Sequence, residues 1–456
     1  MQSRPKGNLS RQPAQFGVQD ARKTSQEGKG EVRLRLEPAA SHFGPGLPED
    51  SELSQSADFS SKRDDNMLSF VLMSVNFSTT NAPVGAQRTS KWREEPTLRE
   101  LLLLVALGGV LFYVTTSVLG GWHKVVLEYG DNLAYLQSAT AIRNWDFHGI
   151  DIHHFLGYPY AIAAVSRAFH LPTDLALTLV AGVACLASTF LVARLFGPWV
   201  AGYFAFTNLA WLQASFAGGS EPLAVALGLG AFASFRRGRT LWATLLAALA
   251  TTVRPLTFFA LIGIGIALLY RKHYAKFLSS LSLGIVIGLL YVWPLTHYFA
   301  DPWLTVRSYV YSDYGAGAMS GPHGHLFGWP FHAIVVGTMV YPAPWTNLVL
   351  SCSWIALVVA GVAAMFFRDY RQYARANPAE AIFAGLFLLA IFCYDYLVWA
   401  RGNFMRFSIP VMPFVFFALL RWLPKDRRIF WGLGALAPVL AACSAVGIKN
   451  VFPFLR

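Results

Sequence analysis

The stretch Leu98-Arg-Glu-Leu-Leu-Leu-Leu-Val-Ala-Leu-Gly-Gly-Val-Leu-Phe-Tyr-Val-Thr-Thr-Ser-Val-Leu119 decides the fold class of this chain. After Glu100 it holds no charged residue, and it is about as long as the roughly 20 apolar residues that cross a bilayer. Similar blocks recur, so that 55% of the 456 residues are hydrophobic and only 14% are charged. A soluble protein carries about 25% charged residues. The sequence therefore predicts an all-α, polytopic membrane protein.

Apolar blocks continue to the end of the chain, and the mean hydropathy is +0.42. They predict about 11 transmembrane helices, within a range of 9–12. The fourth, fifth and sixth are short, and we expect them to be tilted, broken or partly re-entrant. The expected spans are 98–119, 173–193, 198–216, 220–235, 241–253, 256–270, 277–298, 346–367, 380–399, 407–420 and 429–447.

Residues 1–95 differ in composition from the rest of the chain. They are rich in Ser, Gln, Gly, Pro and charge without a sustained period, which predicts a disordered cytoplasmic tail. No signal peptide is apparent, and Met67 or Met73 would be the start if part of this tail is an over-extended reading frame. Residues 96–456 are expected to form one transmembrane domain, with two long outward loops at 120–172 and 299–345 that contain interfacial helices.

Basic residues set the orientation. The net charge is +12, of which residues 1–95 contribute +1 and residues 96–456 contribute +11. This excess favours anionic lipid head groups as partners over nucleic acid. Five short alternate loops hold 14 basic residues, which by the positive-inside rule marks them as cytoplasmic. These are Arg194, Arg236, Arg237, Arg239, Arg271, Lys272, Lys276, Arg368, Arg371, Arg375, Arg421, Lys425, Arg427 and Arg428.

The four cysteines all lie inside apolar blocks, so they indicate small buried side chains and neither a disulfide framework nor a zinc site. They are Cys185, Cys352, Cys393 and Cys443.

The first outward loop holds the best catalytic candidate, in Glu128-Tyr-Gly-Asp131-Asn-Leu-Ala-Tyr135. Asp131 and Tyr135 are one helical turn apart, and Gly157-Tyr158-Pro159 follows. A carboxylate just outside the first span can deprotonate a hydroxyl acceptor. The competing structural interpretation is that Asp131 caps a helix.

Two further motifs face the same side. Ser220-Glu221-Pro222 opens the fourth span, where Ser220 fits a helix cap and Pro222 the first turn. Glu221 could alternatively hold a polar substrate. Arg254, in Thr252-Val-Arg254-Pro, is either an arginine that snorkels to a head group or a phosphate ligand, for which a guanidinium is well shaped.

A fourth motif lies near the C-terminal end, in Asp395-Tyr-Leu-Val-Trp-Ala-Arg401-Gly-Asn-Phe-Met-Arg406. Asp395 is expected inside the ninth span, where a charge is costly and has a partner. Arg401 and Arg406 lie on the outer side, against the positive-inside trend, which suggests phosphate binding. A structural Asp395–Arg401 pair is the alternative.

Metal binding has weaker support. Asp151, His153 and His154 resemble a ligand cluster, but adjacent side chains point apart on a helix or strand. His323 and His325 add two histidines without a recognisable spacing. We expect no protein metal site from these residues, although a divalent ion at Asp131 is possible.

In their order, these motifs resemble integral-membrane glycosyltransferases of the C-type fold (GT-C). An acid in the first outer loop precedes Gly-Tyr-Pro, Ser-Glu-Pro opens a short span, Arg-Pro follows, and an Arg precedes Pro-x-x-Pro. The likeness is closest to the dolichyl-phosphate-mannose-dependent, RgtA/ArnT-like and protein O-mannosyltransferase-related group, and covers about residues 98–425. One departure is Asn132, where the group commonly has a second acid.

The resemblance implies a membrane enzyme without a nucleotide-sugar site. Asp131 takes the place of the catalytic acid, and Glu128, Tyr135, Tyr158, Glu221, Arg254, Arg401 and Arg406 are the candidate substrate-binding residues. The implied donor is a hexose or mannose-like sugar on polyprenyl phosphate, and the acceptor is a lipid, glycan or protein. The implied location is the bacterial inner membrane, with transfer on the non-cytoplasmic face. A transporter or flippase for lipid-linked saccharides is the alternative, and a non-catalytic scaffold is a third possibility.

Overall fold

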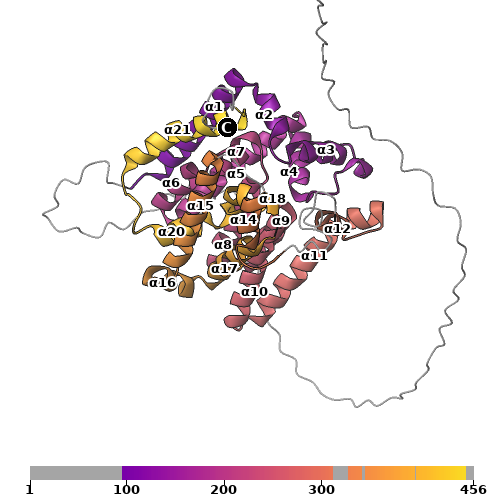
Figure 1. The fold of residues 1–456 in the computed structure, drawn as a ribbon. Coiled ribbons are helices and arrows are strands. Elements are labelled where there is room, and N and C mark those ends of the chain that lie inside the picture. The colour runs from indigo at the N-terminus through magenta and orange to yellow at the C-terminus, as the bar shows by residue number, and fades with distance from the viewer. Residues whose placement is uncertain (1–94, 312–326, 341–344, 396, 448–456) are drawn as a thin grey trace, which may run out of the picture. The chain divides into compact units, whose positions relative to one another are not determined.

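The structure is a computed structural model that describes residues 95–311, 327–340, 345–395 and 397–447. The regular secondary structure of the described residues is helical, apart from one isolated β-bridge between Phe327 and Tyr394 (Figure 1). The all-α fold class predicted from the sequence is confirmed. The expected N-terminal tail, except for Glu95, and residues 312–326 of the second long loop lie outside the described residues.

The first helix, α1 (Leu98–Leu119), begins at a capping box. The Thr97 side chain accepts from the Glu100 backbone N–H, and Glu100 accepts in return from the Thr97 N–H. Along its length α1 packs against α21 (Arg427–Ala445), and the two helices lie side by side in Figure 1. Glu100 also accepts from Arg427 and from the Trp431 indole, so polar contacts fix the pair at one end.

Five helices are long and apolar enough to cross a membrane, or up to seven if each of two sharply bent pairs counts as one span. The bent pairs are α7–α8, which turns by 102°, and α16–α17, which turns by 117°. Three shorter apolar helical segments lie at 240–253, 255–270 and 409–419. Of the three short spans expected from the sequence, 220–235 forms one arm of the α7–α8 bend, whereas 241–253 and 256–270 coincide with two of the shorter apolar helical segments.

The remaining helices follow in chain order. In the first outward loop they are α2 (Trp122–Glu128), α3 (Asn132–Arg143), η3 (Phe147–Gly149) and α4 (Gly157–Ala168). The central group is α5 (Thr173–Phe196), α6 (Pro198–Thr207), α7 (Leu209–Ala217), α8 (Glu221–Arg236), α9 (Thr240–Val253), η4 (Pro255–Phe258), α10 (Phe259–Tyr270) and α11 (Tyr274–Phe299). The C-terminal group is α12 (Leu304–Tyr311), α14 (His332–Val340), α15 (Trp345–Ala364), α16 (Arg368–Ala376), α17 (Pro378–Cys393), α18 (Leu397–Gly402), α19 (Phe404–Phe407), η5 (Ile409–Val411) and α20 (Met412–Leu419).

Apolar side chains cover the outside of several long helices. On α11 only 17% of the most apolar window is buried, and Leu289, Leu290 and Trp293 are 62%, 68% and 58% exposed. Such a surface would be costly in water, and it suits the hydrocarbon of a bilayer. The chain is thus an integral membrane protein.

The loops expected in the cytoplasm meet at one end of α5. Arg236 forms a two-pronged ion pair with Glu380, at 2.6 Å for each oxygen, and its guanidinium reaches the Leu195 carbonyl at 3.4 Å. At the same end of α5, the Phe196 ring packs against Tyr373, which accepts from Arg236. The opposite end of α5 contacts the first outward loop, where His123 meets Asp174 at 3.0 Å. Because α5 has 24 residues, the two ends are about 36 Å apart.

Two glycines let the backbone turn or approach closely near the outward end. Gly218 adopts φ +103° between α7 and α8, where a side chain would be strained and would also clash with Leu177. Gly157 begins α4 against the end of α9, and a Cβ there would lie 2.6 Å from the Thr252 carbonyl oxygen. The Gly of Gly-Tyr-Pro thus permits the α4–α9 contact.

One expectation about the fold was wrong. Asp395 was placed inside the ninth span, but α17 ends at Cys393. The Cys393 carbonyl accepts from the Gly328 N–H at 2.7 Å, and Tyr394 forms the β-bridge with Phe327. Asp395 therefore lies in a non-helical link, where its carboxylate contacts His332 Nδ1 at 2.8 Å.

The grouping of the loops predicts a labelling pattern. Single cysteines would be placed at the exposed positions Asn144 and Trp329 on the outward side, and at Arg237 and Gln372 on the cytoplasmic side, after replacement of the four native cysteines. With intact cells, a membrane-impermeant maleimide should label the first two only, since charged probes do not cross the bilayer. The second two should react after permeabilisation. Labelling of positions 144 and 329 from opposite sides would contradict the topology.

Candidate functional site

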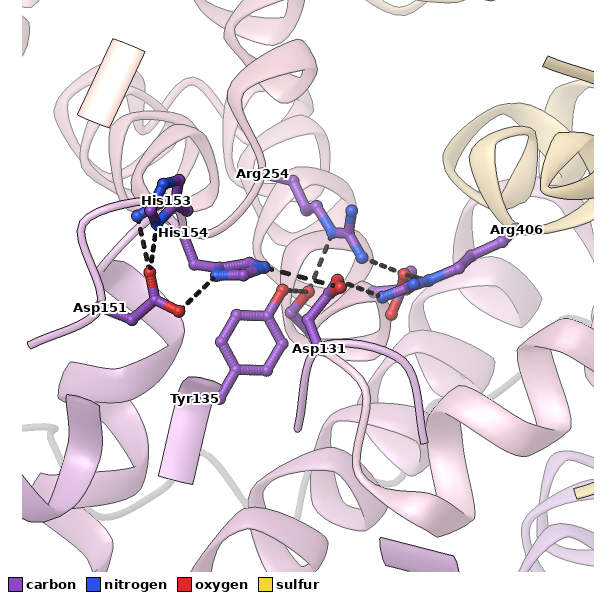
Figure 2. Close-up of polar contacts among 9 residues, drawn as sticks. Asp131, Tyr135, Asp151, His153, His154, Arg254 and Arg406 are labelled. Atoms are coloured by element: carbon purple, nitrogen blue, oxygen red, sulfur yellow. Dashed lines mark hydrogen bonds and ion pairs between the residues drawn. The ribbon is translucent and has the colours of Figure 1, made fainter. Parts of the chain in front are cut away.

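Four charged side chains from distant parts of the sequence meet near the outward end. Figure 2 shows Asp131, Arg254 and Arg406 converging. The Glu221 carboxylate accepts from both arginines. Arg406 donates through Nε to Glu221 and through Nη2 to Asp131 at 3.1 Å. Arg254 donates to the same Glu221 oxygen. Two carboxylates and two guanidinium groups thus form one continuous network.

The Asp131 side chain does not cap a helix. Asp131 occupies the N-cap position of α3, but its carboxylate makes no capping hydrogen bond and faces Arg406 and His154. The capping interpretation of Asp131 is therefore wrong. The carboxylate is available for chemistry because the backbone of α3 does not occupy it.

Asn132 has the structural role at this turn. It is completely buried, and its amide donates to the Val126 and Ala217 carbonyls, both at 2.8 Å. A carboxylate at position 132 would face two carbonyl oxygens and would be repelled by both. This explains why the second acid expected from the family resemblance is absent here: the position joins α3 to the end of α7.

The bend of 102° between α7 and α8 places Ser220 and Glu221 at an elbow. Ser220 is at the N-cap of α8, yet its side chain makes no capping bond. Instead its hydroxyl accepts from Arg254 Nε at 2.9 Å and contacts the Tyr135 hydroxyl at 3.2 Å. The capping interpretation of Ser220 is also wrong, since the hydroxyl orients Arg254. The Glu221 side chain is only 3% exposed.

The two arginines come from breaks in helices. Arg254 follows α9 with an extended backbone, and Arg406 lies on the short helix α19. Arg406 also lies over the Tyr129 ring, 5.8 Å from its centroid. Their side chains are 24% and 13% exposed and fully engaged by carboxylates, which does not fit arginines that snorkel to lipid head groups.

Two histidines extend the network on the other side of Asp131. His154 Nε2 lies 3.6 Å from Asp131, and its Nδ1 lies 3.3 Å from Asp151. His153 Nδ1 contacts the other Asp151 oxygen at 3.1 Å. The expectation that adjacent histidines point apart was wrong, because residues 151–154 form an irregular turn in which helix and strand geometry do not apply.

The environment perturbs the pKa values of these groups. Burial raises the pKa of Asp131, but the His154 contact and the positive charges of Arg406 and Arg254 outweigh it and hold the pKa well below its usual range. Burial lowers the pKa of His154, but Asp131 and Asp151 outweigh it and raise the pKa to about 9. The His154 contact lowers the pKa of Asp151 to about 2. At neutral pH both carboxylates are ionised and His154 is protonated.

The other expected site residues lie at different depths. Tyr135 is buried beside Ser220, and burial raises its pKa to about 12. Tyr158 is completely buried, and its hydroxyl donates to the Gly218 carbonyl at 2.8 Å, so it supports the elbow from below. Glu128 is 66% exposed and faces Lys124 at 3.8 Å, away from the network. Arg401 is a buried side chain on α18.

Sequence reasoning missed three contributors: the Ser220 hydroxyl, Asn132 and His154 in its contact with Asp131. The local sequence does not predict these three roles. Ser220 and Asn132 contact partners that are distant in sequence, and His154 lies in an irregular turn. Among the residues that the structure describes, no group of three or more His, Cys, Asp or Glu side chains is arranged to hold a metal ion.

The chain is similar to two crystal structures of ArnT from Cupriavidus metallidurans, one bound to undecaprenyl phosphate and one in the apo state. The TM-scores are 0.41 and 0.40, with 16% and 18% sequence identity over 78% and 73% of this chain. The matches cover 66% and 61% of the ArnT chains, so this chain spans less than two thirds of their length. No protein-family profile and no curated protein matches the sequence.

The shared carboxylate predicts a stability effect. Glu221→Gln leaves two largely buried arginines without their common counter-ion, and breaking a buried pair in this way costs about 3–5 kcal/mol. We expect a clear fall in the thermal unfolding midpoint of the detergent-solubilised protein, followed by tryptophan fluorescence. Glu128→Gln, on an exposed pair, is the matched control and should change the free energy of unfolding by less than about 0.5 kcal/mol. Equal midpoints for both variants would contradict the role of Glu221.

Proposed function

We propose that this protein is a membrane glycosyltransferase that moves a sugar from a polyprenyl-phosphate donor to a hydroxyl acceptor, with inversion at the anomeric carbon. The observation that carries the proposal is the network itself: an Asp carboxylate free of backbone contacts, next to two arginines held at a helix elbow. A base and a phosphate-binding pair side by side are what this reaction requires. We place the site on the non-cytoplasmic face, opposite the basic loops.

In this proposal Arg254 and Arg406 bind the donor phosphate. Each guanidinium has five N–H donors in a planar fork that matches phosphate oxygens. Both are preorganised, Arg254 by the Ser220 hydroxyl and Arg406 by the Tyr129 ring. The phosphate competes for them with Glu221 and Asp131, so donor binding loosens the Asp131–Arg406 contact. Asp131 then becomes a stronger base, since a cation beside a carboxylate lowers its proton affinity.

The chemical step follows from these positions. Asp131 takes the proton of the acceptor hydroxyl as the hydroxyl oxygen forms a bond to the anomeric carbon. The bond between that carbon and the phosphate oxygen breaks, and its electron pair stays on the phosphate. The two arginines stabilise the additional negative charge on the leaving polyprenyl phosphate. Attack from the face opposite the phosphate inverts the anomeric configuration.

Glu221 has a second possible use in the same site. One of its oxygens accepts from both arginines, whereas the other is buried and has no hydrogen-bond partner among the described residues. A buried acceptor of this kind is costly unless it is satisfied. We propose that a hydroxyl group of the donor sugar satisfies it once the arginines turn toward the phosphate.

The first test removes the base. Asp131→Asn keeps the shape of the side chain and removes its charge. Because Arg406 keeps its pair with Glu221, the protein should still fold. Loss of a general base reduces the rate by about 10²–10⁴-fold. We expect transfer from a radiolabelled polyprenyl-phosphate sugar by the purified variant to fall below about a tenth of wild type. Activity above that level, with unchanged elution and thermal stability, would remove Asp131 from the catalytic role.

The second test concerns the phosphate. Arg254→Ala and Arg406→Ala should each weaken binding of undecaprenyl phosphate by about tenfold or more, and the Lys variants by less, because Lys keeps the charge but lacks the fork. Arg167→Ala, at an exposed arginine that lies over Trp145, is the control and should bind as wild type. Equal affinities for wild type and both alanine variants would refute the phosphate assignment.

A reconstituted vesicle assay separates the enzyme from the alternative transporter or flippase. A transferase forms a new glycosidic bond in detergent, where no membrane gradient exists. A flippase moves labelled lipid-linked saccharide across vesicles and leaves it chemically unchanged. Movement without transfer would favour the transporter.

A further inference from the structure

A histidine and a second aspartate lie directly behind the proposed base. In Figure 2 His154 lies between Asp131 and Asp151, with Nε2 toward the first and Nδ1 toward the second. Asp151 is itself fixed, since its backbone N–H donates to Ser138 on α3 at 2.9 Å. The His153 backbone N–H donates to the Asp151 carboxylate at 2.7 Å. The ring of His154 is therefore held from behind and directed at Asp131.

Aromatic side chains restrict the same ring. The rings of Tyr135 and His154 form a T-shaped contact with centroids 5.5 Å apart, and the His154 side chain is 28% exposed. On the neighbouring helix α11, the Tyr291 hydroxyl accepts from the Leu156 N–H at 3.3 Å and anchors the turn after the histidine. His154 is thus placed by packing as well as by charge.

The charges of the cluster balance only when His154 is protonated. The cluster holds three carboxylates (Asp131, Asp151 and Glu221) and two arginines (Arg254 and Arg406). Asp131 and Asp151 face the imidazole directly, the Tyr135 ring packs against it, His153 shares the Asp151 carboxylate, and both arginines lie beyond Asp131. A protonated imidazole brings the sum of these six groups to zero, and the paired carboxylates on both sides stabilise that form.

We propose that His154, held by Asp151, is a positioning residue that supplies the counter-charge of Asp131 when a donor phosphate draws Arg406 away. This inference rests on the proposed function and extends it. If His154 were absent, the withdrawal of Arg406 would leave Asp131 without a contacting cation. At the same time the phosphate would bring another negative charge into the site. With His154 in place, the carboxylate stays ionised and keeps its orientation toward the acceptor. His154 remains protonated throughout, and the acceptor proton goes to Asp131.

The first experiment measures the protonation of His154 without relying on turnover. The full chain is labelled with ¹³C-histidine in detergent micelles, and the His154→Gln spectrum assigns the resonance. The resonance should titrate near pH 9, well above the usual 6.5. Undecaprenyl phosphate should move its midpoint upward, and Asp151→Asn should move it downward because one anionic partner is lost.

The outcomes separate this inference from the proposed function. A His154 midpoint near pH 6.5 overturns the role of His154 alone. The same conclusion follows if undecaprenyl phosphate shifts other histidine resonances but leaves the His154 midpoint unchanged. If no histidine resonance responds to undecaprenyl phosphate, the proposed donor and the role of His154 fail together.

The second experiment follows transfer against pH. Protonated His154 is the working form, so wild-type activity should hold below about pH 9 and fall above it. His154→Gln should lower the rate about tenfold or more and abolish this alkaline limb, and Asp151→Asn should shift the limb to lower pH. His148→Gln, at an exposed histidine of the same loop whose ring meets Tyr298 on α11, is the matched control and should stay within about twofold of wild type. If His154 had a purely structural role, the His154→Gln variant would be less active but would keep the fall in activity above pH 9. That result would overturn the proposal.

Discussion

The arrangement of the outward end depends on one buried carboxylate, that of Glu221. It accepts from two arginines that come from breaks in different helices, and its own helix begins at a sharp elbow. Burying such charges is costly, and the cost is offset only when each charge has a partner with good geometry. Any shift of α8, α9 or α19 would leave one group unpaired. The ion pairs thus fix helix ends that apolar packing alone would leave free to slide.

Backbone features rather than side-chain packing create the room for this network. Gly218 takes a positive φ, so the chain can turn between α7 and α8, and Gly157 lets α4 approach the end of α9. The Tyr158 hydroxyl donates to the Gly218 carbonyl and satisfies a polar group at the turn. Helix ends leave backbone N–H and carbonyl groups without hydrogen-bond partners. A protein that positions charges at helix breaks therefore needs polar side chains such as Tyr158 to pair with those groups.

The same charges constrain the chemistry. Asp131 is held ionised by the His154 contact and by two arginines, which makes it ready to accept a proton but weakens it as a base. A bound phosphate would pair with the arginines in place of Asp131. The basicity of Asp131 would therefore rise when the donor binds. In the proposed enzyme, donor binding and base activation are therefore coupled through Arg406, which contacts Asp131 and Glu221 at once.

The sequence by itself determined the helical membrane class and where the apolar helices lie, because hydropathy is a local property of the chain. Which residues share one side of the membrane stays a prediction from the basic loops. The close approach of Asp131, Glu221, Arg254 and Arg406 was expected from a family resemblance, and the tertiary structure gives its geometry. Only the structure decided that neither Asp131 nor Ser220 caps its helix, that Asn132 joins α3 to α7, and that both histidines turn to Asp151. Side-chain direction at a helix end or in an irregular turn depends on partners from distant segments, and no local periodicity encodes it.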